Sequence, residues 1–303
     1  MVSNHKNRDL EELIEYHLKE RRRFNYVKII STFFKHLILL VGAMVMLLPL
    51  LWMISTSLSP DSVIIKYQLI PKEFTFANYI RAWDFSRQFD ETVSLGTFLW
   101  NSVLIATLIT VPGLLVDSLA GYIFARRNVP GKNLLFYLAL MTLMIPFYVI
   151  AVPMFLFVKG LGWLDSFQGQ IVPFLASGFG VFMFKQFFQE VPNELEDAAS
   201  IDGCTTFQIY SRIMMPLAKP IIGTMVIFKA MWSWNLFMWP LLIINDIKFK
   251  PLPLALTMFR GLNVTQWGML CAGMTIATLP IVILYLSMQG MFHKGIMAGA
   301  VKG

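Results

Sequence analysis

The sequence predicts an all-α polytopic membrane protein with six transmembrane helices, and three observations support this fold class. Hydrophobic residues make up 56% of the 303 residues and charged residues only 14%, which is far from the balance of an ordinary globular domain. The apolar residues gather in stretches of about 18 residues or more, the length that crosses a bilayer as a helix. Alternating strands of about ten residues, the pattern of a membrane barrel, are not seen.

Six stretches form the predicted spans, and only the fifth contains a charge, Lys229. In chain order they are 36–60, 92–116, 133–158, 166–184, 220–245 and 261–293. We therefore divide the chain into a cytoplasmic tail, 1–35, and a six-span membrane domain, 36–303. A helical stripe of leucine and isoleucine within 8–23 makes the tail amphipathic, which suits either an interfacial or partner-binding helix or a solvated charged helix.

The orientation of the predicted spans follows from the basic residues. With the N-terminus on the cytoplasmic side, sixteen of the 25 Lys and Arg fall on that side. Cytoplasmic loops carry an excess of these residues, so we expect both termini in the cytoplasm. The net charge of +7 is then a signal of topology, and no soluble basic face points to a nucleic-acid partner.

Catalytic and metal-binding motifs are not found in the sequence. Its two cysteines are far apart and form no metal or disulfide framework, and its four histidines lack the H-E-x-x-H spacing. A phosphate-binding loop is also missing, because "PGKN" at 130–133 lacks the first glycine and the hydroxyl residue. We expect neither an enzyme nor a bound metal or cofactor in this chain.

The most polar long stretch in the second half of the chain lies within 190–216, between the fourth and fifth spans. Asn193 followed by Glu196 has the spacing of a helix start, with the Asn side chain as the cap. Asp202-Gly203 has the composition of a helix end. The stretch therefore begins with a short helix that ends in a sharp bend.

A second short helix is predicted directly after this bend. Thr205 followed by Gln208 repeats the capping spacing, and Pro216 is expected to stop the helix before the fifth span. Two helices joined by a glycine make a rigid projection, and a helix placed in a partner's groove is a common mode of recognition.

The stretch "DAASIDGCTTFQIYSRIMMP" resembles the EAA motif of the permeases of ATP-binding-cassette importers. The matching positions are Asp197, Ala198, Ala199, Gly203, Ile213, Met215 and Pro216. Asp197 stands where the family usually has Glu, and Met215 where it usually has Leu, so charge and apolar bulk are kept. The segments 120–132, 232–242 and 297–303 also resemble the carbohydrate, maltose-type branch, and the resemblance extends over 37–303.

The resemblance implies a subunit of a sugar or oligosaccharide importer in a bacterial or archaeal cytoplasmic membrane. It implies a coupling helix between spans four and five that inserts into an ATPase dimer, where ATP and Mg²⁺ would bind. We assign Asp202 to the same coupling surface. The other implied partners are a second homologous permease subunit and an extracytoplasmic solute-binding protein.

Polar side chains within the spans are candidates for the substrate path, since burying them in lipid is costly. The candidates are Asn101, Lys229, Trp234 and Asn235. An aromatic face beside an amide suits a neutral sugar, and contact with lipid or packing between helices explains the tryptophans equally well. Lys229 either pairs with Asp117, which we prefer, or lines the path and favours an anionic sugar. A self-sufficient secondary transporter is the alternative function, but it needs no EAA-like motif and would be expected to show internal repeats.

Overall fold

The computed structural model describes the backbone of residues 2–60, 69–259 and 265–300, and most of these residues are α-helical. Side chains are described for residue 28 and for 30–60, 69–259 and 265–290. In chain order the α-helices are α1 (Val2–Ser57), α2 (Ala77–Asp84), α3 (Leu95–Arg126), α4 (Lys132–Met141), α5 (Phe147–Gly160), α6 (Phe167–Ile171), α7 (Gly178–Glu190), α8 (Asn193–Ile201), α9 (Thr206–Ile209), α10 (Met215–Leu217), α11 (Lys219–Trp234), α12 (Met238–Ile243), α13 (Leu252–Ala255) and α14 (Trp267–Ala300). Short 3₁₀ helices are η2 (Phe85–Gln88), η3 (Val172–Phe174), η5 (Ile247–Phe249) and η6 (Leu256–Phe259), and η4 (Tyr210–Met214) is a π-helical turn.

Five helical segments of the described chain are long and apolar enough to cross a membrane: Ile30–Ser57, Leu95–Arg126, Phe167–Glu190, Lys219–Ile243 and Trp267–Gly290. The third predicted span, 133–158, is divided into α4 and α5. Pro146 explains the division, because its extended backbone has no N–H to donate and the residue before a proline avoids the helical conformation. The all-α membrane fold is confirmed, and the count of six spans stays a prediction.

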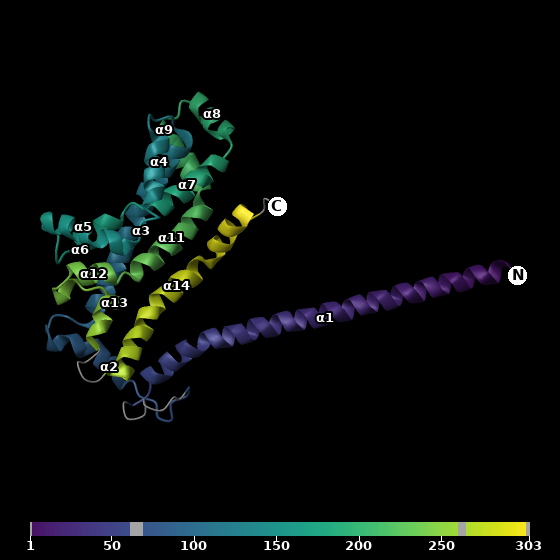
Figure 1. Cartoon of the computed structure of the whole chain (residues 1–303), viewed down its shortest axis with the longest axis horizontal. Helices are drawn as coiled ribbons and strands as arrows, with labels where there is room; N and C mark the ends of the chain where they lie inside the picture. Colours follow the sequence, from purple (N-terminus) through teal and green to yellow (C-terminus); the bar gives the residue numbers. More distant parts are fainter. Residues whose placement is uncertain (1, 61–68, 260–264, 301–303) are drawn as a thin grey trace.

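Helix α1 extends away from the rest of the molecule, with its N-terminus far from every other helix (Figure 1). The backbone is helical across the predicted boundary between the tail and the first span. The predicted apolar stripe of the tail lies outside the residues whose side chains are described. Along the described part of α1 most apolar side chains are exposed, as for Met46 at 79%, which suits contact with lipid or another subunit.

Helix α3 lies at the centre of the bundle, where it packs against α7 and α11, while α14 packs against α11 and α1 (Figure 1). Glycine permits the close approach of α3 and α7, because a Cβ on Gly121 would lie 2.6 Å from Cβ of Phe184. Towards the Arg126 end of α3, a buried cluster includes Tyr122, Phe188 and Met214. This cluster places the polar stretch 190–216 directly on the central helix.

Candidate functional site

Helix α8 begins at Asn193, directly after Pro192, and its first turn is acidic. The prediction that the Asn193 side chain caps this helix is wrong, since Pro192 occupies the cap position and no side chain bonds there. The Asn193 Oδ1 instead accepts a hydrogen bond from the guanidinium of Arg126. Because Pro192, in an extended conformation, occupies the cap position, the Asn193 side chain is not needed there and makes a tertiary contact instead.

The bend after α8 is the predicted one. Gly203 has a φ of +80°, in the left-handed region, and a Cβ built there would meet nothing within 4 Å. The N–H of Cys204 bonds the carbonyl of Ala199 at 2.9 Å, and the N–H of Gly203 bonds that of Ser200 at 3.1 Å. This pair of bonds is a Schellman motif, which satisfies carbonyls that the helix end would leave free.

The start of the second helix is also confirmed. Thr205 and Gln208 form a reciprocal capping box in which each side chain accepts from the other residue's N–H. The prediction that Pro216 stops this helix is wrong, because the helical path continues through α10 to Leu217. Since Pro216 has no N–H, the helix adapts by widening into the π turn, where the N–H of Met215 bonds the carbonyl of Tyr210, five residues earlier.

Helix α8 presents two different faces. Asp197 and Ala198 are exposed, while Glu196 and Ala199 are buried against the rest of the chain. Of the predicted coupling residues, Asp202, Gly203 and Pro216 are also exposed and Ile213 is half-buried. Of the predicted coupling residues, Ala199 therefore does not lie on the outer face, because it packs in the chain's own core in the same cluster as Phe188 and Ile209.

Large apolar side chains are exposed on the polar stretch. Ile201, at the end of α8, is 86% exposed, and Phe207, at the start of α9, is 69% exposed. Both flank the Gly203 bend. An exposed apolar tip on an otherwise polar projection is typical of a surface that meets another protein.

The buried face of α8 contacts the end of α3 through a charged cluster. Arg126 Nε lies 3.4 Å from Glu196 Oε1, and Arg127 Nη2 lies 3.3 Å from Glu196 Oε2. Arg127 also donates to the hydroxyl of Tyr122, and Arg126 donates to the carbonyl of Val191. This cluster was not predicted from the sequence. Its local signals are the consecutive arginines at the end of α3 and the acidic residue in the first turn of α8, and no local pattern connects the two segments.

Lys229 is paired, as preferred from the sequence. Its Nζ lies 2.7 Å from Oδ2 of Asp117, and the two side chains are 6% and 0% exposed. The second span is predicted to end at residue 116, directly before Asp117, whereas α3 continues to Arg126, so Asp117 lies within the helix. Glycine makes room for the pair, since a Cβ on Gly113 would collide with Nζ of Lys229 and one on Gly180 would collide with Oδ2 of Asp117.

The same pair satisfies backbone groups where a membrane helix is broken. Between η3 and α7 the carbonyl of Leu175 accepts from Lys229 Nζ at 2.9 Å, and the N–H of Ser177 donates to Asp117 Oδ1 at 2.8 Å. Unpaired backbone groups are costly in hydrocarbon, and non-helical backbone is tolerated there only when protein covers it. The ion pair therefore holds α3, α7 and α11 together at the break.

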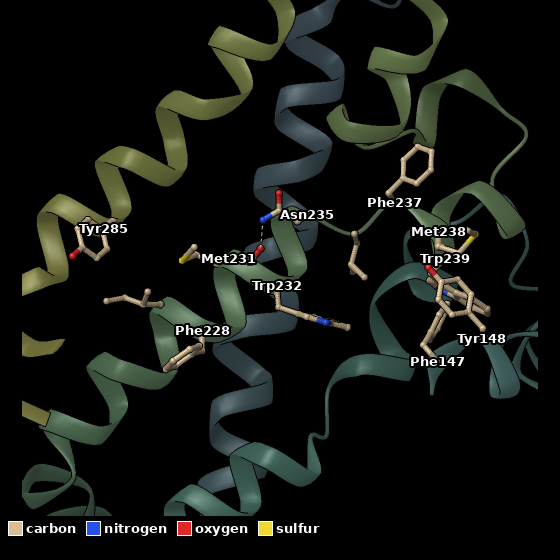
Figure 2. A pocket seen from close by; sticks show the side chains of 12 residues that line it. Phe147, Tyr148, Phe228, Met231, Trp232, Asn235, Phe237, Met238, Trp239 and Tyr285 are labelled. Carbon is tan, nitrogen blue, oxygen red and sulfur yellow. Dashed lines mark hydrogen bonds between the residues drawn. The ribbon is translucent and has the colours of Figure 1, made fainter. Parts of the chain in front are cut away.

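A cavity of about 780 Å³ lies among α5, α11, α12 and α14. Figure 2 shows Phe147, Tyr148 and Trp239 together on one side of it, Trp232 in the middle and Tyr285 of α14 on the other side. Its lining contains no charged side chain. Cavities of this size with mostly aromatic walls and few polar groups are typical of small-molecule sites.

Asn235 is the one predicted path residue that lines this cavity. It lies at the end of α11, and its Nδ2 donates to the carbonyl of Met231 at 2.7 Å (Figure 2). That bond orients the amide and leaves its oxygen and one N–H for a ligand. The 49% exposed ring of Trp232 lies edge-on to Phe174, with the ring centroids 5.1 Å apart.

The other predicted path residues are placed differently. Trp234 is 7% exposed and its Nε1 donates to the carbonyl of Ala277 at 3.2 Å, so it packs between helices. Asn101 is buried and its Nδ2 donates to the carbonyls of Lys248 at 2.7 Å and Lys250 at 3.0 Å. Neither residue lines the cavity, nor does Lys229.

The loop around Lys248, whose carbonyl bonds Asn101, makes a second contact with the segment before α3. Lys248 Nζ lies 3.3 Å from Oδ2 of Asp90, which precedes α3. The pKa of Asp90 lies below its usual value, chiefly because the Thr92 hydroxyl and N–H donate to the carboxylate. Asn101 therefore has a structural role near the Leu95 end of α3, where it holds the loop that contains Lys248 and Lys250.

One sequence signal could have found the α11 wall of the cavity. Phe228, Met231, Trp232 and Asn235 recur at the spacing of one helical face, and all four line the cavity. Phe147 and Tyr148 come from α5, and no local pattern connects them with α11. Among the described residues, no group of three His, Cys, Asp or Glu side chains is placed to hold a metal ion.

Comparisons with known proteins agree with this architecture. Residues 117–297 match the family described as "Binding-protein-dependent transport system inner membrane component". The arabinooligosaccharides transport system permease protein AraQ of Bacillus subtilis (strain 168) is 33% identical over 292 residues, which cover 94% of this chain and all of that protein. The trehalose/maltose transport system permease protein MalG of Thermococcus litoralis is 29% identical over 276 residues, 89% of this chain and 98% of the relative.

Relatives and solved structures named for acidic compounds are also similar to the chain. The sn-glycerol-3-phosphate transport system permease protein UgpE of Pectobacterium atrosepticum is 30% identical over 268 residues, 87% of this chain and 95% of the relative. A bacterial ABC transporter involved in the import of the acidic polysaccharide alginate has a chain of the same fold, with a TM-score of 0.76. The identity to it is 22%, and the match covers 87% of this chain and 96% of that one.

Proposed function

This chain belongs to the family of binding-protein-dependent transport system inner membrane components, and on that premise we propose that it is the permease subunit of an ATP-driven importer for a sugar or oligosaccharide. It is a transport component rather than an enzyme, and it lies in the membrane as a multi-pass protein. Importers of this kind also contain an ATPase, a second permease and a solute-binding protein. We propose an ATPase dimer that binds ATP and Mg²⁺, a homologous but different second permease, and cytoplasmic termini.

The observation that carries this proposal is the exposed apolar tip around Gly203. Asp197 and Ala198 on the outer face of α8, together with Ile201 and Phe207, are exposed, and no described part of the chain covers them. The capped helices on both sides of the bend make that surface rigid. A rigid apolar projection suits insertion into a groove of the ATPase subunit.

The substrate that best suits the cavity is a neutral saccharide. Its aromatic walls match the apolar C–H faces of sugar rings, and Asn235 supplies an amide for hydroxyl groups. An anionic sugar would need a countercharge, and Lys229 is already committed to Asp117 and to the carbonyl of Leu175. The anionic alternative therefore loses the residue on which it depended.

The test is ATPase binding by variants of the full chain, co-expressed with the ATPase and the second permease of its importer. Ile201→Glu with Phe207→Glu should abolish co-purification of the ATPase, because charges would enter an apolar contact. Val129→Glu is the matched control, since Val129 is exposed in the loop after α3 and the change has the same chemistry. Binding that survives the double substitution, or sugar uptake by the chain without an ATPase, would reject the proposal and favour a secondary transporter.

A further inference from the structure

Glu196 is an acidic residue with an unusual position on the coupling helix. It is 9% exposed, and it points away from the outer face that carries Asp197 and Ala198. Charged residues are rarely buried unless they are paired. Its partners are Arg126 and Arg127, which lie 70 and 69 residues earlier in the chain and therefore form a long-range connection.

These contacts tie α8 to α3 at several points. The Glu196 carboxylate faces both arginines, and the hydroxyl of Tyr122 donates to its Oε2 at 3.4 Å. Arg126 also donates to Asn193 Oδ1 and to the carbonyl of Val191, and so binds the chain just before α8 and at its first residue. A guanidinium that bonds several acceptors in fixed directions restrains the orientation of α8 as well as its distance from α3.

The helix ends favour the same arrangement. Arg126 is the last residue of α3, where the helix dipole attracts a positive charge, and Glu196 lies in the first turns of α8, where a negative charge is favoured. The Arg127 guanidinium also lies 5.2 Å from the centre of the Tyr122 ring. The charged groups thus have local reasons to stay in place when the elements around them move.

The chain connections of α8 lead to α7 and α9. Two residues link α8 to α7, and four residues that include Gly203 link it to α9. The first of these links contacts α3, because the carbonyl of Val191 accepts a hydrogen bond from Arg126. Helix α3 itself packs against α7 and α11 and carries Asp117. Together with the bonds from Arg126 to Asn193 and Val191, the cluster at Glu196 forms the direct polar contact between α8 and α3 in the described part of the chain.

We propose that Glu196, held by Arg126 and Arg127, is a positioning residue that makes α8 and α3 move as one body, so that a push on α8 reaches the centre of the bundle through α3. This inference rests on the proposed role of α8 as the helix that meets the ATPase. It adds a transmission step that lies on the opposite face of α8 from the partner contact.

The test compares two equivalent substitutions on α8 in the complete importer reconstituted into liposomes. Glu196→Gln removes the buried charge and keeps the side-chain shape, while Glu194→Gln makes the same change at an exposed position. We expect Glu196→Gln to lower the sugar transported per ATP hydrolysed by about five-fold, the low end of typical coupling between linked sites. ATPase binding should stay normal, and Glu194→Gln should match wild type.

A purely structural role predicts something else, namely loss of assembled complex with an unchanged ratio of sugar to ATP in what remains. That result, or an unchanged ratio in a fully assembled Glu196→Gln complex, would overturn the inference. If Glu196→Gln fails to assemble, Arg127→Gln decides, because it removes one contact and leaves the Arg126 contact in place; it should lower the same ratio to a smaller extent. If the wild-type chain neither binds an ATPase nor uses ATP, the proposed function itself is wrong. That outcome is distinct from a failure of the inference about Glu196, which is measured in a working importer.

Discussion

Helix α3 carries charged clusters at two levels, one in its middle and one at its end, and they are built differently. In the middle, Asp117 and Lys229 are almost fully buried, and their remaining bonds go to backbone groups of Leu175 and Ser177. At the end of α3, the cluster around Glu196 contains side-chain atoms without a hydrogen-bond partner, among them Oε1 of Glu196. The Arg127 side chain there is 32% exposed.

This difference separates an ion pair that holds the bundle together from a cluster with several partners that holds α8 on α3. The middle pair also bonds backbone groups at a helix break, so any separation would leave charges and backbone groups unpaired in a membrane. The end cluster has several acceptors within reach of two guanidinium groups, so the loss of one contact leaves others that still hold α8 on α3. We infer that the middle of α3 keeps the bundle together while its end follows α8.

The largest expected effect comes from breaking the middle joint. Lys229→Met would leave the Asp117 carboxylate buried without its countercharge, which should cost about 3–5 kcal/mol of stability. Thermal unfolding of the purified complex and its yield measure this cost. Adding Asp117→Asn should restore part of the loss, because the amide oxygen can still accept from the N–H of Ser177. Wild-type stability in the single variant, or a selective loss of acidic-sugar uptake with normal assembly, would contradict the static role.

A smaller effect is expected at the Gly203 bend, which follows α8. Gly203→Val forces a β-branched residue to a φ of +80°, which should cost about 1–2 kcal/mol locally. No atom lies near the new Cβ, so the cost is confined to the backbone and membrane insertion should persist. ATPase binding and sugar uptake should fall, and Gly203→Asn should be milder, since Asn tolerates the left-handed conformation. Full uptake with normal ATPase binding in the valine variant would show that the bend is not needed.

The smallest effect is expected in the cavity, away from both clusters. Trp232→Ala removes an exposed aromatic face from its centre and should raise the apparent KM for sugar between about two-fold and about ten-fold, the range of one aromatic contact. Trp267→Ala is a matched control, because Trp267 is also 49% exposed and does not line the cavity. Equal effects of the two substitutions on uptake would remove the cavity from the proposed substrate path.

The sequence predicts the helical segments well because their length and apolar character are local properties. The capping box at Thr205 and the bend at Gly203 are equally local, and both are confirmed. Residues whose roles depend on helix facing were harder to assign. Trp232 and Trp234 are two positions apart, yet one lines the cavity and the other donates to the carbonyl of Ala277.

The effect of a proline on a helix was also hard to predict from the sequence. Pro216 was expected to end a helix, but a π turn absorbs its missing N–H, and Pro146 divides a stretch that reads as one continuous apolar run. Whether a proline ends, divides or only distorts a helix depends on which neighbours can satisfy the freed carbonyls. The Glu196 cluster depends in the same way on tertiary contacts, since its partners lie in another segment of the chain.

The central claim is that α8 and α3 move together, and a distance between spin labels on these two helices tests it most directly. Ser200→Cys on α8 and Leu115→Cys on α3 are exposed positions for the labels, with Cys204 and Cys271 replaced by alanine. In the complete importer we predict the same distance distribution with and without trapped ATP. With Glu196→Gln added, the distribution should shift when ATP binds. A shift of equal size in the presence of Glu196 would contradict the account.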